Sequence, residues 1–159
     1  MKALATLIVV SAFCAGLQLP QAHYRHAGAG PVLLPDSAVT PGVVATSDTA
    51  VVCHRSTTTV RHTTQRMKNA VYAAYGIRAH HEGQYEIDHL IPLELGGADT
   101  VANLWPQPAA PVPGFHQKDW LENHLHELVC AGRLELPAAQ RLIAADWYGL
   151  YLREFGEAK

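Results

Sequence analysis

The chain has 159 residues, of which 48% are hydrophobic and 16% are charged, and its formal net charge is −2. This length leaves no room for two substantial hydrophobic cores, and the composition excludes a disordered chain. Ten histidines are many for the length, so metal binding and acid–base chemistry remain open.

The N-terminus carries a lone Lys2 followed by the apolar run ALATLIVVSAFCAGL. This run is short for a membrane-spanning helix, which needs about 20 apolar residues, and it has the length of a signal-peptide core. We therefore predict a signal peptide over residues 1–22 with an unassigned cleavage site, and a retained or lipidated anchor is the alternative. The mature protein is expected to be secreted or periplasmic, without stable membrane insertion.

The mature chain begins with a segment that lacks periodicity. Residues 23–49 are rich in Gly, Ala, Pro and Thr, which predicts a flexible linker that wraps loosely on the domain. The domain itself is expected to span residues 50–159. A short strand is predicted around Cys53, within residues 51–60.

A helix and a β-hairpin are expected next. Apolar residues recur at helical spacing over residues 64–75, which predicts a helix capped by Thr63 or Thr64. Alternating polar and apolar residues predict a strand within residues 84–95. After a glycine turn, a second short strand begins at residues 103–105, and a proline-rich loop follows it.

Two helices are expected to complete the domain. Residues 115–131 show an apolar stripe at helical spacing, made of Leu121, Leu125, Leu128 and Val129. A last helix opens at Pro137 and runs to about Phe155. One face of this helix is predicted to contain Ala138, Leu142, Ala145 and Tyr148 or Gly149. The order helix, hairpin, helix, helix predicts a small α+β domain.

Removal of the signal peptide leaves two cysteines, Cys53 and Cys130. An even number of cysteines in an oxidising compartment favours a disulfide. A bridge that closes so long a loop would stabilise the fold by ~4 kcal/mol. Two buried free thiols are the alternative.

Basic residues gather in one part of the chain. Between Thr49 and His81 there are five basic residues and no acidic one, whereas acidic residues dominate from Glu82 onward. Such a segment fits phosphate contacts that position a nucleic acid, DNA or RNA, without reading its sequence. The candidates for these contacts are Arg55, Arg61, Arg66, Lys68, Arg78 and, outside the segment, Lys118. A solvated basic face is the alternative.

Asp88 and His89 stand near the end of the first predicted strand of the hairpin, and Asn103 follows fourteen residues after His89. The pattern D-H-x-x-P-L-x-x-G-G followed by N-L resembles the hairpin of HNH (ββα-metal) nucleases. Further matches to small exported bacterial HNH-like proteins are Val129-Cys130, Lys118-Asp119 with Glu122-Asn123, and Ala139-Gln140 through Ile143-Ala144 to Asp146-Trp147. The resemblance covers roughly residues 35–153 and implies a ββα-metal hairpin–helix core with flanking helices.

The resemblance also implies roles for three hairpin residues. His89 would be the general base that deprotonates the attacking water, which is worth roughly 10²–10⁴-fold in rate. Asp88 would bind a divalent cation that neutralises charge building on the phosphate. Asn103 would hold the hairpin loop, and with it His89, by side-chain to backbone hydrogen bonds. Oxygen ligands suit Mg²⁺ or Mn²⁺ best, and an added histidine ligand would admit Zn²⁺ or Ni²⁺.

The helix residue that completes the metal site departs from the family pattern. Where that pattern has a His or Asn near the helix start, this chain offers His116, Asp119, Glu122 and Asn123. His116 matches by residue type and Asp119 by charge, so these two are predicted as ligands alongside Asp88. Lys118 and Glu122 are spaced i, i+4 and could simply pair with each other. The choice among the four stays open.

These patterns predict an exported, metal-dependent endonuclease that hydrolyses phosphodiester bonds in nucleic acids. The alternative is a non-catalytic exported nucleic-acid-binding or interaction domain that keeps the hairpin as a scaffold. A toxin-like effector with the same chemistry is a third hypothesis, and it would be expected to have an immunity partner.

Overall fold

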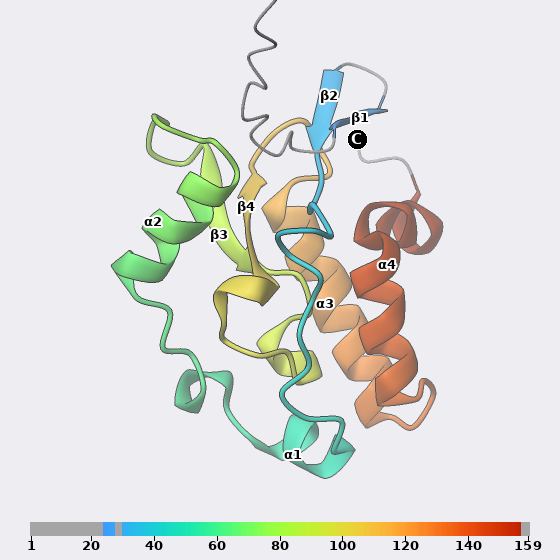
Figure 1. The fold of residues 1–159 in the computed structure, drawn as a ribbon. Helices are drawn as coiled ribbons and strands as arrows, with labels where there is room; N and C mark the ends of the chain where they lie inside the picture. The colour runs from blue at the N-terminus through green and yellow to red at the C-terminus, as the bar shows by residue number, and fades with distance from the viewer. Residues whose placement is uncertain (1–23, 28–29, 157–159) are drawn as a thin grey trace, which may run out of the picture.

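A computed structural model describes residues 24–27 and 30–156 (Figure 1). The predicted signal peptide over residues 1–22 lies outside the described residues. The helices and strands, in chain order, are β1 (Tyr24–Ala27), β2 (Gly30–Leu33), α1 (Thr49–His54), α2 (Gln65–Ala74), β3 (Tyr85–His89), β4 (Leu104–Pro108), α3 (Phe115–Cys130) and α4 (Leu136–Phe155). Among the described residues, no helix has both the length and the apolar character needed to cross a membrane.

Over the described residues, the fold combines helices with two antiparallel two-stranded sheets. Strand β1 pairs with β2, and β3 pairs with β4 in a register that runs from Tyr85 opposite Pro108 to His89 opposite Leu104. Helices α3 and α4 lie side by side and pack against each other (Figure 1). The predicted α+β class is therefore confirmed, whereas a ββα-metal core in the finer sense stays a prediction.

The core lies where the β3–β4 hairpin, α3 and α4 meet. Leu104 and Trp105 from β4 are fully buried, as is Leu121 from α3, and Trp147 from α4 is 2% exposed. The rings of Trp105 and Trp147 lie with their centroids 6.0 Å apart. Burial of each such large apolar side chain stabilises the fold by roughly 1.5–3 kcal/mol. This packing fixes the hairpin against α3.

Helix α2 and helix α3 are confirmed almost to the residue. Thr64 caps α2, and its hydroxyl accepts a hydrogen bond from the backbone N–H of Met67. Helix α3 runs over Phe115–Cys130, close to the predicted residues 115–131. The second hairpin strand extends farther than expected, because β4 continues through two prolines to Pro108. Proline is tolerated there because each strand of a two-stranded sheet is an edge strand.

The predicted strand around Cys53 is wrong, because residues 49–54 form helix α1. The side chain of Asp48 accepts hydrogen bonds from the backbone N–H groups of Ala50 and Val51, which starts the helix. The pair Val51-Val52 favours a strand by local preference. The cap and the burial of Val52 outweigh that preference.

The predicted flexible linker over residues 23–49 is wrong for the stretch from Leu33 to Asp48. This irregular segment, which turns at residues 37–39, runs from β2 to α1 between the hairpin and the helices (Figure 1). Thr40 is fully buried, and its hydroxyl donates to the backbone carbonyl of Leu104 at 2.9 Å. The backbone N–H of Ala45 donates to the carbonyl of Gly96 at 2.8 Å. The lack of periodicity in this segment reflects partners on other elements rather than looseness.

The predicted face of the last helix is wrong for Leu142 and Ala145, which are exposed, whereas Tyr148 is buried as predicted. The buried positions of α4 include Ala139, Ile143, Trp147 and Tyr151, whereas Leu142 is 41% exposed. Asp146 departs from helical geometry, with φ −164° and ψ 72°, which kinks the helix. The buried residues nevertheless keep a spacing of four across Asp146, so the predicted stripe is displaced by one residue, with Ala138 and Leu142 in place of Ala139 and Ile143.

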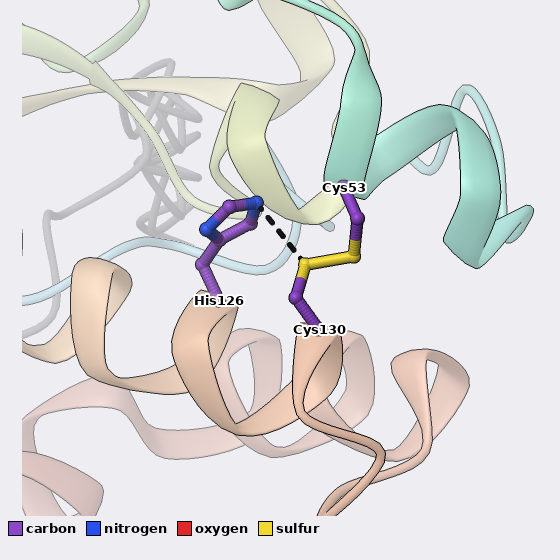
Figure 2. Close-up of side chains that lie close together, drawn as sticks. All are labelled: Cys53, His126 and Cys130. Atoms are coloured by element: carbon purple, nitrogen blue, oxygen red, sulfur yellow. Dashed lines mark hydrogen bonds between the residues drawn. A yellow bond between two sulfur atoms is a disulfide. The ribbon is translucent and has the colours of Figure 1, made fainter.

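The predicted disulfide between Cys53 and Cys130 is confirmed (Figure 2). It joins α1 to the last residue of α3 across 77 positions of sequence, with the two Cα atoms 5.6 Å apart. The bridge therefore ties the N-terminal part of the domain to the helix that packs on the hairpin.

Candidate active site

The end of β3 presents two neighbouring polar side chains to different parts of the molecule. Asp88 faces helix α3, where its Oδ2 lies 2.7 Å from the ammonium of Lys118. The ring of His89 contacts Asp99 in the loop between β3 and β4. This divergence follows from the strand, on which successive side chains point to opposite faces.

Asn103 holds the loop between the two strands. It is fully buried, and its Oδ1 accepts from the backbone N–H groups of Ile91 at 3.0 Å and Val43 at 3.2 Å. Its Nδ2 donates to the carbonyls of Ile91 and Ala98, each at 2.9 Å. These are side-chain to backbone bonds of the kind predicted for Asn103, while its part in a reaction stays a prediction.

The same loop requires a glycine at position 97. A Cβ built on Gly97 would stand 1.8 Å from the carbonyl oxygen of Ile91, which cannot move without breaking the loop. The Gly96-Gly97 pair therefore allows the close backbone approach that Asn103 then locks.

His89 is 2% exposed, and its Nε2 lies 3.0 Å from Oδ1 of Asp99. Asp99 also accepts from the Thr63 hydroxyl at 2.7 Å and from the backbone N–H of His62. Burial alone would raise the pKa of Asp99, but the hydrogen bonds from Thr63, His62 and His89 together hold it below its ordinary value. Asp99 is therefore a carboxylate at neutral pH.

Burial lowers the pKa of His89, and the hydrogen bond to Asp99 opposes this shift without reversing it. His89 is therefore neutral at pH 7. Because a carboxylate can only accept, the proton of the neutral ring lies on Nε2 and the lone pair lies on Nδ1. A neutral imidazole oriented by a carboxylate has the properties of a general base. Asp99 was not predicted from the sequence, although an acid so close after the glycine turn was a signal that could have found it.

The predicted nucleic-acid contact by Lys118 is wrong. Lys118 is fully buried, and its ammonium donates to Asp88, to the carbonyl of His89 at 2.7 Å and to Glu122. The reason is helical phase, since Lys118 lies three and seven residues before the buried Leu121 and Leu125. The alternative pairing of Lys118 with Glu122 is present. Burial raises the pKa of Glu122, and the charge of Lys118 opposes that shift.

The predicted metal ligands lie in an acidic neighbourhood. Asp88 is half-buried, and His116 and Asp119 are exposed on the first turns of α3. Burial, and after it the charge of Asp88, raises the pKa of both Asp119 and Glu86. Arg61 and His116 act in the opposite direction on both carboxyl groups. Carboxylate oxygens with one imidazole form a donor set whose chemistry fits a hard divalent cation.

Two of the four helix candidates are engaged elsewhere. Glu122 is held by Lys118, and the side-chain amide of Asn123 donates to the backbone carbonyl of Asp119 at 2.9 Å. The bond of Asn123 uses its Nδ2 and leaves Oδ1, the atom that could bind a cation, so His116, Asp119 and Asn123 all stay candidates.

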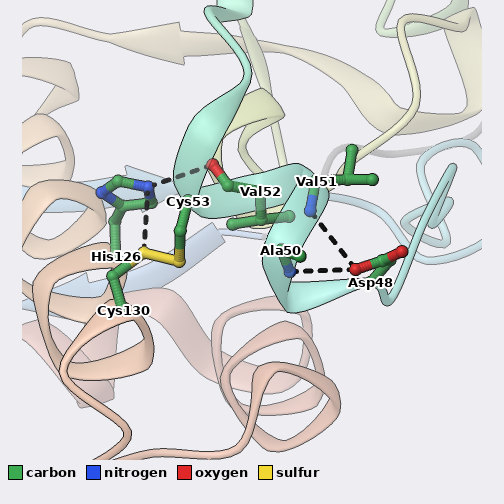
Figure 3. The surroundings of a disulfide bond; sticks show 7 residues. All are labelled: Asp48, Ala50, Val51, Val52, Cys53, His126 and Cys130. Carbon is green, nitrogen blue, oxygen red and sulfur yellow. Dashed lines mark hydrogen bonds between the residues drawn. A yellow bond between two sulfur atoms is a disulfide. The ribbon is translucent and has the colours of Figure 1, made fainter.

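The predicted ligands are neighbours but are not gathered at ligand spacing. Across residues 24–27 and 30–156, the three residues that bring metal-ligand atoms within 4.8 Å of one another are Cys53, His126 and Cys130 (Figure 2). Their two sulfur atoms are bonded to each other, so neither is the thiolate that binds a metal. The ring of His126 lies beside this bridge, with Nε2 3.4 Å from the carbonyl of Val52 (Figure 3). The predicted ligands on β3 and α3 do not form such a group in the part of the chain that the structure describes.

The predicted basic contacts separate into two sets. Arg61 and Lys68 line a cavity of about 440 Å³ together with His62, Thr63, Glu86 and Ile87. This cavity adjoins Asp99, because His62 and Thr63 both donate to that carboxylate. Arg78 instead lines a different cavity, and Arg55 and Arg66 are exposed. The fold thus brings Arg61 within electrostatic reach of His89, and Arg61 and Lys68 line one cavity that adjoins Asp99.

Comparisons with protein-family models, with curated proteins and with solved structures find no match to this chain. The likeness to HNH nucleases therefore rests on the motif residues themselves.

Proposed function

We propose that this protein is an exported HNH-type endonuclease that hydrolyses phosphodiester bonds in nucleic acids. The observation that carries the proposal is the hydrogen bond by which Asp99 orients His89 at the end of a strand whose loop is held by Asn103. The cavity with Arg61 and Lys68 beside it supports a polyanionic substrate.

His89 would act through Nδ1, which takes a proton from the attacking water while Nε2 keeps its hydrogen bond to Asp99. The positive charge that then forms on the ring is stabilised by the Asp99 carboxylate. Proton transfer by a positioned group of this kind contributes roughly 10²–10⁴-fold in rate. Arg61 and Lys68 would hold the phosphate backbone, and contacts of this kind position a nucleic acid without reading its bases.

Asp88, with Asp119 or His116 from α3, would hold a divalent cation such as Mg²⁺ or Mn²⁺. When bound, the cation supplies neutralisation of the charge that develops on the phosphate. Zn²⁺ or Ni²⁺ would fit if His116 is the helix ligand. The disulfide between Cys53 and Cys130 supports an oxidising compartment such as the periplasm or the medium.

The test is cleavage by the purified, oxidised mature protein of plasmid DNA and of RNA, with Mg²⁺ or Mn²⁺ and then with chelator. We expect cleavage that chelator abolishes and that His89→Ala lowers by roughly 100-fold or more. His81→Ala is the matched control, because His81 is an exposed loop histidine and should keep full activity. Cleavage by His89→Ala at the rate of the unaltered protein would overturn the assignment of the base.

A second candidate is a non-catalytic nucleic-acid-binding or interaction domain. The observation that favours it is the engagement of Asp88 by Lys118, which occupies one of the two oxygens that a metal would use. Binding of nucleic acid without cleavage in any metal would support this candidate instead.

A further inference from the structure

The side-chain ammonium of Lys118, on helix α3, is fully buried beside the candidate active site. Lys118 is fully buried, and three oxygen atoms accept from its Nζ: Asp88 Oδ2 at 2.7 Å, the carbonyl of His89 at 2.7 Å, and Glu122 Oε1. An ammonium has three N–H donors, so these three acceptors satisfy it fully. No donor of Lys118 is left for a phosphate or for water.

The three acceptors come from two different elements. Asp88 and His89 end strand β3, whereas Glu122 lies one turn after Lys118 on α3. The ammonium therefore connects the hairpin to the helix. Burial lowers the pKa of Lys118, but the charges of Asp88 and Glu122 outweigh this and hold it above its ordinary value. Lys118 is thus a cation throughout the physiological range.

We propose that Lys118 is a resident cation of this domain, which holds β3 on α3 and keeps Glu122 and one oxygen of Asp88 from any divalent metal. The ammonium holds the strand and the helix together by binding oxygen atoms from both, as a bound metal ion would. The hairpin–helix unit then folds without metal, and any divalent cation is restricted to the other oxygen of Asp88 and to His116, Asp119 or Asn123. This role goes beyond the proposed function, because it concerns what holds the site together.

Removal of the ammonium should uncover a divalent-cation site. In Lys118→Ala, the oxygens of Asp88, His89 and Glu122 would face the space that the ammonium filled. Two carboxylates and a carbonyl are hard oxygen donors, which suit Mn²⁺ or Ca²⁺. A divalent cation should therefore replace the lost charge in this variant.

The experiment compares melting temperatures of the oxidised wild-type protein, Lys118→Ala and Lys118→Ala/Glu122→Gln, first in chelator and then with millimolar Mn²⁺. In chelator we expect Lys118→Ala to melt roughly 10 °C or more below the wild type, because it leaves two carboxyl groups without their cation. Mn²⁺ should recover a large part of that loss. The recovery should disappear in the double variant, which lacks one of the carboxylates.

Two results would overturn the proposal. The first is a Lys118→Ala protein that melts at the wild-type temperature in chelator. The second is a Mn²⁺ shift that is equal in the wild type, Lys118→Ala and the double variant. If Lys118→Ala does not fold in chelator, the readout becomes recovery of folding on addition of Mn²⁺, and absence of recovery would contradict the inference.

Two matched variants of Lys118 separate the effect of its charge on stability from the effect of its size. Lys118→Arg keeps a cation and Lys118→Met keeps a long unbranched side chain without charge, so Arg should be the more stable of the two. Equal or greater stability of Lys118→Met would show that the charge is not needed. None of these measurements uses nucleic acid, so their outcome is independent of whether the protein is a nuclease.

Discussion

The two sides of the candidate site are built differently. On the hairpin side, Asn103 and His89 are buried and bonded to fixed partners, and Asp99 is held by the loop that precedes α2. On the helix side, His116 and Asp119 are exposed on the first turns of α3. The difference indicates that His89 and Asp99, the proposed proton-transfer pair, are positioned before any ligand binds, whereas His116 and Asp119 are not held by such bonds within the described part of the chain. Lys118 lies between the two sides and joins them.

The largest expected loss of stability comes from removing the side-chain hydrogen bonds of Asn103. Asn103→Ala should destabilise the protein by about 4 kcal/mol, because it leaves several buried backbone groups without partners. Chemical denaturation measures the change. Asn69→Ala is the matched control, since Asn69 is exposed on α2 and accepts a hydrogen bond from Gln65 of the same helix. A loss below about 1 kcal/mol for Asn103→Ala would mean that the hairpin side is not held as described.

Reduction of the disulfide should be the next largest effect, because it frees α1 from the end of α3. We expect the free energy of unfolding to fall by about 2–4 kcal/mol. Thermal melting with and without a dithiol reductant measures this. The variant Cys53→Ser/Cys130→Ser should be insensitive to the reductant. An unchanged melting temperature of the wild type on reduction would count against a contribution of the bridge to stability.

Substitution of Asp99 tests whether the hairpin side is positioned for proton transfer. Asp99→Asn should lower kcat by roughly 10–100-fold with little change in KM, because the ring of His89 loses the carboxylate that orients it. Asp48→Asn is a control, because Asp48 caps α1 away from this site. Equal kcat in Asp99→Asn and the wild type would remove Asp99 from the reaction.

The pH dependence of His89 tests the same side. Its pKa is lowered in the folded protein, so the unfolded chain binds the proton more readily. The stability that the neutral ring contributes is fully present above the pKa of His89 in the unfolded chain, which is about 6.5. It is lost as the pH falls from there through the lower pKa of His89 in the folded protein. Cleavage by the neutral base should likewise persist to below about pH 6.5. An acid limb of the rate profile above that pH would contradict the lowered pKa.

The smallest effect is expected from the basic contacts. Arg61→Ala should raise KM by about 5- to 10-fold, because Arg61 lines the cavity beside the site. Arg55→Ala, the matched control, alters an exposed arginine outside that cavity and should change KM by less than about twofold. Equal effects of the two substitutions at several salt concentrations would indicate a diffuse basic face.

Local patterns in the sequence were sufficient for the features that depend on neighbouring residues. The glycine turn, the cap at Thr64 and the apolar repeat of α3 each act over a short stretch of chain, so their elements could be predicted. The Cys53–Cys130 bridge could be predicted because only two cysteines follow the expected signal peptide.

Only the tertiary structure decided the features whose partners are distant in sequence. Lys118 shares the helical phase of the apolar stripe of α3, but only the structure shows the acceptors that allow its burial, among them Asp88, which precedes it by 30 positions. The irregular segment with Thr40 has hydrogen-bond partners on β4 and at the end of α2. Asp99 acquires its role from contact with His89 and Thr63. A buried charge or an irregular segment is stable only with its partners, and the fold alone brings these together.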